Sequence, residues 1–146
     1  MTAIRQIEKL GYDSRDVRHI VMTHLDFDHA GGLDDFPEAT VHLLRDERIY
    51  AEAQRTWMDR QRFRPQQWST RSHWVTYDIR AGERWFGLEC VRQLKGVPPE
   101  ILMVPLIGHT FGHSGIAIQT SERWMFLAGD AYFYYKEMNY RDPRCT

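Results

Sequence analysis

The stretch Thr23–Leu33 reads THLDFDHAGGL, and it gathers two histidines and two aspartates directly after an apolar run and before a glycine pair. Imidazole and carboxylate groups bind most divalent metal ions in proteins. If the first part of the stretch is extended, alternate side chains project to one side of the chain. We then expect one short loop to serve two adjacent metal ions, with His24, Asp26 and Asp28 on one side and His29 on the other.

Helix capping is the alternative interpretation of this stretch. An acidic turn ahead of a helix can stabilise the helix N-terminus, and Asp28 would stand at the helix start. Capping requires one short polar side chain, whereas this stretch offers four metal-competent ones within six residues. Metal binding is therefore the preferred hypothesis.

Two later turns carry side chains of the same kind. Residues 107–115, IGHTFGHSG, follow an apolar strand and contain His109 and His113. Residues 126–130, FLAGD, end another apolar run with Asp130. Each of three separate predicted strands is thus followed by a metal-competent residue. Separate structural roles for these residues would not explain why the same pattern occurs three times.

The bulk composition excludes several classes of protein. The chain has 146 residues, 42% hydrophobic and 27% charged, which is ordinary for one soluble globular domain. Its formal net charge of -1 gives no electrostatic argument for nucleic acid or for an anionic membrane surface. No apolar run reaches the roughly 20 residues that span a bilayer, and the N-terminus has no signal-like apolar segment. We therefore expect a cytoplasmic protein that binds neither nucleic acid nor membrane.

The pattern of the remaining chain indicates helices mixed with several strands, an α/β or α+β layered domain. We predict helices over residues 2–10, 33–37 and 45–64, and no regular element over 65–80. Strands are predicted over residues 17–22, 40–44, 85–91, 101–107, 115–120 and 124–127. His42 alternates with apolar neighbours in a predicted strand and is expected to be structural. His73 is not expected to bind metal.

The three ordered motifs resemble those of the metallo-β-lactamase-fold hydrolases. That family has a first motif H-x-H-x-D-H, a G-H-T-x-G-H turn, an aspartate after an apolar strand and a last histidine. Here the matches are His24, Asp28 and His29, then His109, then Asp130, with 80 residues from His29 to His109 and 21 from His109 to Asp130. The resemblance covers about residues 17 to 132 and looks most like lactonases and glyoxalase-II-type thioesterases. It implies a partial αββα sandwich.

The resemblance also implies a role for each matched residue. One metal ion would be held by His24, Asp26 and His109, the other by Asp28 and His29, and Asp130 would bridge the two. Zinc is the implied metal, and a hydroxide between the ions would be the nucleophile. Asp28 and Asp130 are the residues expected to serve catalysis. His113 is expected to support the ligands rather than to be one.

The sequence departs from the family pattern at three places. Asp26 stands where the family usually has histidine. The first ion would then have two histidines and one carboxylate as ligands, His24, His109 and Asp26, and this set makes Fe²⁺ or Mn²⁺ an alternative to zinc. None of residues 131–146 is a histidine, and only about twenty residues precede the first motif. We therefore expect residues 1–146 to form one domain that lacks N-terminal strands and a C-terminal part. A weak second metal site and exposed sheet edges, covered by a second copy of the chain, would follow.

Three functions are compatible with these residues. The first is a metal-dependent hydrolase of an ester-like bond, a lactone or thioester with an apolar acyl part. The aromatic stretches around residues 68–77 and 132–135 suggest that apolar part. The second is a mononuclear iron oxidoreductase of the same fold, similar to persulfide dioxygenases. The third is a catalytically inactive metal-binding fragment.

Overall fold

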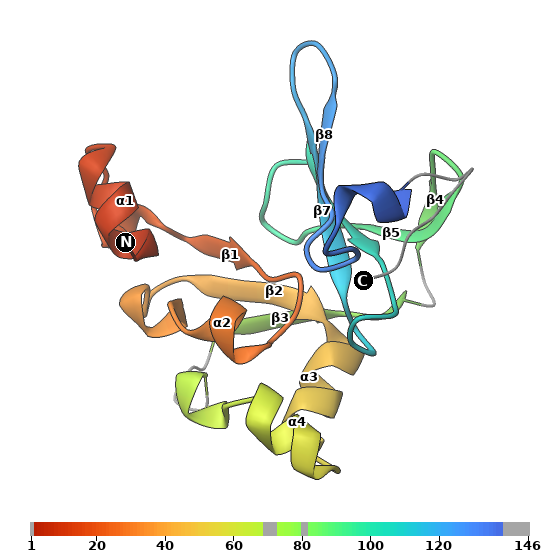
Figure 1. Cartoon of the computed structure of the whole chain (residues 1–146). Helices are drawn as coiled ribbons and strands as arrows, with labels where there is room; N and C mark the ends of the chain where they lie inside the picture. Colours follow the sequence, from red (N-terminus) through yellow and green to blue (C-terminus); the bar gives the residue numbers. More distant parts are fainter. Residues whose placement is uncertain (1, 69–72, 80–81, 139–146) are drawn as a thin grey trace.

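A computed structural model of the chain describes residues 2–68, 73–79 and 82–138. A helix, α1 (Ala3–Lys9), leads to the edge strand β1 (His19–Val21), as Figure 1 shows. The first sheet has the order β1-β2-β3, with β2 (Thr40–Leu44) parallel to both β1 and β3 (Trp74–Tyr77). Parallel neighbours require crossover connections. The connection from β1 to β2 contains α2 (Phe27–Ala30), and the connection from β2 to β3 contains α3 (Arg45–Ala53) and α4 (Trp57–Arg62).

The second sheet is antiparallel and has the order β4-β5-β6-β7-β8. Its strands are β4 (Glu83–Trp85), β5 (Leu88–Gln93), β6 (Ile101–Pro105), β7 (Ser114–Gln119) and β8 (Trp124–Leu127). In Figure 1 the β7–β8 hairpin projects beyond the first sheet. Short single-turn 3-10 helices complete the described chain, at Ser14–Asp16, Leu33–Asp35, Pro65–Gln67 and Tyr135–Met138.

The core lies in two layers on either face of the first sheet. On one face, Val41 and Leu43 pack with Leu25, Ala51 and Phe63 against the helices. On the other face, Leu44 packs with residues of the second sheet, Leu94, Met103 and Ile116. Strand β2 is buried on both faces, and accordingly its sequence TVHLL does not alternate strictly between apolar and polar residues. The result is a helix–sheet–sheet arrangement, which confirms the expected mixed, layered fold.

Three predicted elements have different boundaries. The expected helix 45–64 is two helices, because Gln54 has a left-handed backbone conformation and Thr56 caps α4 through its side chain. The expected strand 85–91 is a hairpin, in which Phe86 and Gly87 both have positive φ and reverse the chain. The expected helix 33–37 is only a 3-10 turn over Leu33–Asp35.

The stretch 65–80 was predicted to be irregular, and that prediction is wrong for its second half. It contains β3, which pairs with β2, although residues 69–72 and 80 lie outside the described residues. Trp68 is buried in the core against the helices, and Trp74 packs against the same cluster. These aromatic side chains are therefore core residues, and no substrate contact is inferred from them.

The strand ends bring the three motifs to one edge of the layers. The first loop follows β1, the second joins β6 to β7, and Asp130 follows β8. Ser114, the first residue of β7, donates its backbone N–H to the Thr23 carbonyl at 2.9 Å, which ties the first two loops together. Within the described residues no helix is long and apolar enough to cross a membrane.

Candidate metal centre

His24 is the most deeply buried member of the centre. Its side chain has no solvent exposure, and Nδ1 lies 2.9 Å from Thr23 Oγ1. Nε2 has no hydrogen-bond partner among the described residues. A buried imidazole whose one nitrogen is oriented by a hydroxyl, and whose other nitrogen is unsatisfied, fits a metal ligand.

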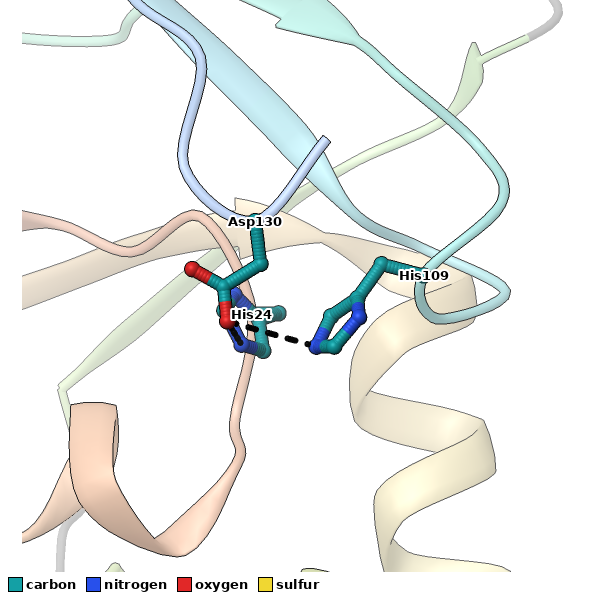
Figure 2. A group of neighbouring side chains, drawn as sticks. All are labelled: His24, His109 and Asp130. Carbon is teal, nitrogen blue, oxygen red and sulfur yellow. Dashed lines mark ion pairs between the residues drawn. The ribbon is translucent and has the colours of Figure 1, made fainter. Parts of the chain in front are cut away.

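His109 and Asp130 face that nitrogen from the two other loops (Figure 2). One donor atom from each of His24, His109 and Asp130 lies within 4.8 Å of the others. Asp130 Oδ2 lies 3.7 Å from His24 Nε2 and 3.5 Å from His109 Nε2. Residues 24, 109 and 130, far apart in the sequence, therefore form a single group of donors.

The Asp26 carboxylate lies against two members of this group. Its Oδ2 lies 3.4 Å from His24 Nε2 and 3.0 Å from His109 Nε2. Asp26 Oδ2 is therefore near both imidazole nitrogens of the group. Asp26 also precedes α2 in the N-cap position, but its side chain makes no capping hydrogen bond. The Asp26 carboxylate is thus directed into the centre and does not cap α2, while Asp28 stands in the first turn of that helix, where the capping interpretation placed it.

His29 and Asp28 form a second, more open group around the same aspartate. His29 Nε2 lies 3.4 Å from Asp130 Oδ2 and 3.7 Å from Asp28 Oδ2. The Asp28 side chain is 60% exposed and that of His29 32% exposed, against 0% for His24. His29 thus lies between the two carboxylates at a more solvated position, but among the described residues only His24, His109 and Asp130 have donor atoms that all lie within 4.8 Å of one another.

The predicted orientation of the first loop needs a correction. We expected an extended loop, with His29 pointing away from His24 and Asp28. The chain is helical from Phe27 onward, and this turn returns His29 to the centre, where its ring centroid lies 4.1 Å from that of His24. All six predicted ligands are nevertheless brought together: His24, Asp26, Asp28, His29, His109 and Asp130.

His113 supports the centre from behind, as expected from the sequence. It is fully buried, and burial lowers the pKa of its imidazole. Nδ1 lies 2.9 Å from the Leu106 carbonyl, and Nε2 accepts the backbone N–H of Asp130 at 3.0 Å. Gly129 permits this approach, because it has φ of 56° and a Cβ there would lie 2.7 Å from His113 Nε2. His113 thereby fixes the backbone that carries Asp130.

Glu47 connects two of the ligand loops and was missed by the sequence analysis. This buried carboxylate on α3 accepts the Leu25 N–H at 2.8 Å, between two ligands of the first loop. Its other oxygen accepts the Thr110 hydroxyl at 2.5 Å and the Gly112 N–H at 3.2 Å, beside His109. Gly112 has no room for a side chain, since a Cβ would collide with the Glu47 backbone. In the sequence, nothing distinguishes Glu47 from the other acidic residues of the predicted helix 45–64.

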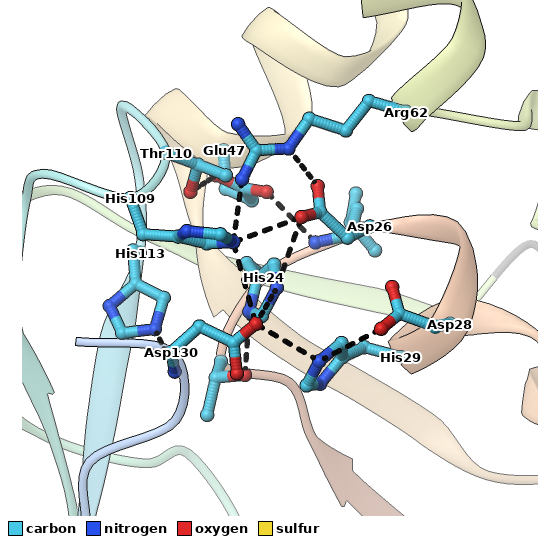
Figure 3. Close-up of polar contacts among 12 residues, drawn as sticks. His24, Asp26, Asp28, His29, Glu47, Arg62, His109, Thr110, His113 and Asp130 are labelled. Atoms are coloured by element: carbon cyan, nitrogen blue, oxygen red, sulfur yellow. Dashed lines mark hydrogen bonds and ion pairs between the residues drawn. The ribbon is translucent and has the colours of Figure 1, made fainter. Parts of the chain in front are cut away.

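Arg62, the last residue of α4, was also missed. Figure 3 shows its guanidinium reaching over the centre to two ligands. Nε donates to Asp26 Oδ1 at 2.6 Å, and Nη2 lies 2.6 Å from His109 Nε2. Burial raises the pKa of the Asp26 carboxyl, but contacts with His24 and Arg62 outweigh burial and hold that pKa well below its ordinary range. Asp26 is therefore an anion with a cationic partner.

A cavity of about 470 Å³ opens beside Asp26 and His109. Its walls are largely apolar and come from Phe27, Trp57 and Met58. A smaller cavity of about 290 Å³ is also lined by Arg62 and His109, together with Tyr50 and Phe111. The centre thus has apolar space next to its donor atoms. The three remaining histidines lie elsewhere: His42 contacts His19 and Tyr77, and His73 is exposed.

Comparison with known proteins agrees with a metal centre at this place. Residues 1–143 match the metallo-beta-lactamase superfamily. A probable metallo-hydrolase of Mycobacterium tuberculosis is 41% identical over 133 residues, which cover 91% of this chain and 43% of that protein. The N-acyl homoserine lactonase AttM of Agrobacterium fabrum is 44% identical over 48 residues, 33% of this chain and 18% of that protein.

A solved structure extends the likeness to the fold. An N-acyl homoserine lactone hydrolase, with the product N-hexanoyl-L-homoserine at its catalytic metal centre, has a TM-score of 0.68 and 22% identity over 92% of this chain and 46% of that one. The chain spans less than half the length of these relatives. Since the family matches nearly the whole sequence and its motifs converge on one centre, the chain belongs to the metallo-β-lactamase superfamily.

Proposed function

We propose that this centre serves the hydrolysis of an ester-like bond, in a lactone or a thioester, with zinc as the metal. The observation that carries the proposal is the convergence of His24, His29 and His109 on one carboxylate oxygen, Asp130 Oδ2, at 3.4–3.7 Å beside an apolar cavity. When bound, the metal polarises a carbonyl and lowers the pKa of water, so that a nucleophile is available near neutral pH.

The protein residues have separate tasks in this reaction. His24, Asp26, His109 and Asp130 would hold the first ion, and Asp28, His29 and the shared Asp130 the second. Asp28 lies on the open side of the centre and is 60% exposed, so its carboxylate can bind and orient water. Asp130 orients both groups of donors, and His113 fixes its backbone. Asp28 and Asp130 are therefore the carboxylates that we assign to catalysis.

The cavity beside the centre suggests the kind of substrate. Phe27, Trp57 and Met58 provide apolar walls, which suit a hydrocarbon acyl part. The related lactonase and lactone hydrolase support a lactone as the first choice. A thioester remains part of the proposal, and so does a cytoplasmic location.

Asp26 favours one second candidate function. His24, Asp26 and His109 form a set of two imidazoles and one carboxylate, with Asp26 Oδ2 3.4 and 3.0 Å from the two imidazole nitrogens. Such sets are typical of mononuclear non-haem iron. An iron-loaded chain that consumes oxygen while oxidising a persulfide would favour the oxidoreductase over the hydrolase.

A substrate panel tests the hydrolase directly. The chain, supplied with zinc, would be assayed by pH-stat with N-acyl lactones of increasing acyl length, an acyl thioester and a β-lactam. We expect the lactone or the thioester to be turned over faster than the β-lactam, and longer acyl groups to be preferred.

Matched variants give the panel its control. Asp130→Asn should lose at least about a hundredfold in rate, since both donor groups lose their shared anion. Glu52→Gln, on the exposed side of α3, should match the unmodified chain. Zinc bound at the centre without hydrolysis of any ester-like substrate would contradict the proposal.

A further inference from the structure

Arg62 touches two of the proposed ligands of the first ion at once. Its Nε donates to Asp26 Oδ1, and its Nη2 lies at hydrogen-bond distance from His109 Nε2, both at 2.6 Å. The side chain is 32% exposed, while that of Asp26 is only 9% exposed. Arg62 thus brings a fixed positive charge to the first group of donors, since a guanidinium does not lose its proton in proteins.

The two contacts of Arg62 differ in whether the contacted residue keeps a free lone pair for a metal ion. A carboxylate has several lone pairs, so Asp26 can accept from Arg62 through Oδ1 while Oδ2 remains directed at His24 and His109. A neutral imidazole has one acceptor nitrogen with one lone pair. His109 Nε2 therefore either accepts from Arg62 or binds a metal ion, and it cannot do both.

We propose that Arg62 is a built-in competitor of the first metal ion, which keeps Asp26 ionised and paired but must release His109 before that ion binds. Binding of the ion and the Arg62–His109 contact are then mutually exclusive and weaken one another reciprocally. The charge of the guanidinium opposes a divalent cation in addition. The inference concerns metal binding and rests on the metal centre of the proposed function, not on the reaction.

The proposal reverses the usual expectation for a residue that holds a ligand. If Arg62 only positioned Asp26, its removal would loosen the site and weaken metal binding. If Arg62 competes for His109, its removal tightens metal binding. The direction of the change therefore separates competition from simple support.

The experiment measures the dissociation constant for Zn²⁺ alone, by competition with a chromogenic chelator, in the unmodified chain and its variants. Arg62→Gln should bind zinc about tenfold or more tightly than the unmodified chain, because both the competition and the repulsion are removed. Arg62→Lys, which keeps the charge, should gain less. Arg60→Gln, on the same helix but solvent-exposed, should leave the zinc affinity unchanged. Circular dichroism checks that each variant is folded.

A second background isolates the contact with His109. Asp26→Asn should weaken zinc binding, and adding Arg62→Gln to it should still tighten binding, because His109 remains the atom for which Arg62 competes. A dissociation constant for Arg62→Gln equal to or weaker than that of the unmodified chain would overturn the proposal, as would a gain that disappears in the Asp26→Asn background. Zinc binding without hydrolysis would instead count only against the proposed function.

Discussion

At the scale of single residues, a carboxylate at position 26 gives this centre one more negative charge than an imidazole there would. The structure pairs that charge with Arg62 at 2.6 Å. The substitution within the motif could be seen in the sequence, whereas its partner could not. Arg62 lies 36 residues further on, in a stretch with several other arginines, and only the fold brings it to Asp26.

His42 gives a prediction at the same scale. Burial, followed by the neighbouring His19, lowers the pKa of His42 to about 4. An unfolded chain has a histidine pKa of about 6.5, so between these two values the unfolded state binds a proton that the folded state does not. The free energy of unfolding should therefore fall as the pH drops from about 6.5 to 4, by up to about 3 kcal/mol from this residue.

Urea unfolding over this pH range, in a chelating buffer, measures the effect. His42→Asn cannot titrate, so its stability should be lower at pH 7 but should fall less steeply with acid than that of the unmodified chain. Parallel curves for the two proteins would show that His42 is not held neutral by the fold. The network of His42 with His19 at 2.9 Å and Tyr77 at 2.8 Å confirms the structural role expected from the sequence.

At the scale of elements, the strand-then-loop pattern predicted which segments carry the donors, but not how the segments are held together. Each of the three predicted strands exists and ends at its motif. The connection between two of the loops is Glu47, a residue of α3 with no local signal, because buried and exposed glutamates look alike in one sequence. Likewise, β3, the second pairing partner of β2, was not predicted, because its sequence WVTY is too short to show a clear period.

Glu47 provides the test of that connection. Glu47→Ala leaves the buried Leu25 and Gly112 N–H groups without their acceptor, so we expect a loss of about 2–4 kcal/mol in the free energy of unfolding. Zinc affinity should fall as well, because the first loop and the His109 turn are no longer tied. Glu52→Ala, from an exposed ion pair on the same helix, should cost less than about 1 kcal/mol. Similar losses for both variants would contradict the assigned role.

At the scale of the whole molecule, the inner face of the second sheet continues past the first sheet. Met125 and Leu127 of β8 pair with Ile118 and Ile116, which pack in the core between the sheets. Residues directly opposite one another share a face of the sheet, yet Met125 and Leu127 are about half exposed. The pattern of predicted helices and strands could indicate a layered domain, but not which apolar face would stay open.

We propose that a second copy of the chain covers this face and the free edge of β8, the outermost strand of the second sheet. Sedimentation velocity over a range of concentrations should then show self-association, which Leu127→Lys weakens. A monomer at every concentration would count against the second copy.

The central claim is that residues from three separate loops form one metal centre, and the metal content of the chain tests it most directly. The chain would be purified without added metal, reloaded with zinc, dialysed, and measured by plasma mass spectrometry. We predict one tightly held ion per chain and a second retained only in excess zinc, because the first group of donors is the more buried. His109→Ala should lose the tight ion, while His113→Ala should weaken it less. No bound ion, or equal loss in both variants, would contradict the account.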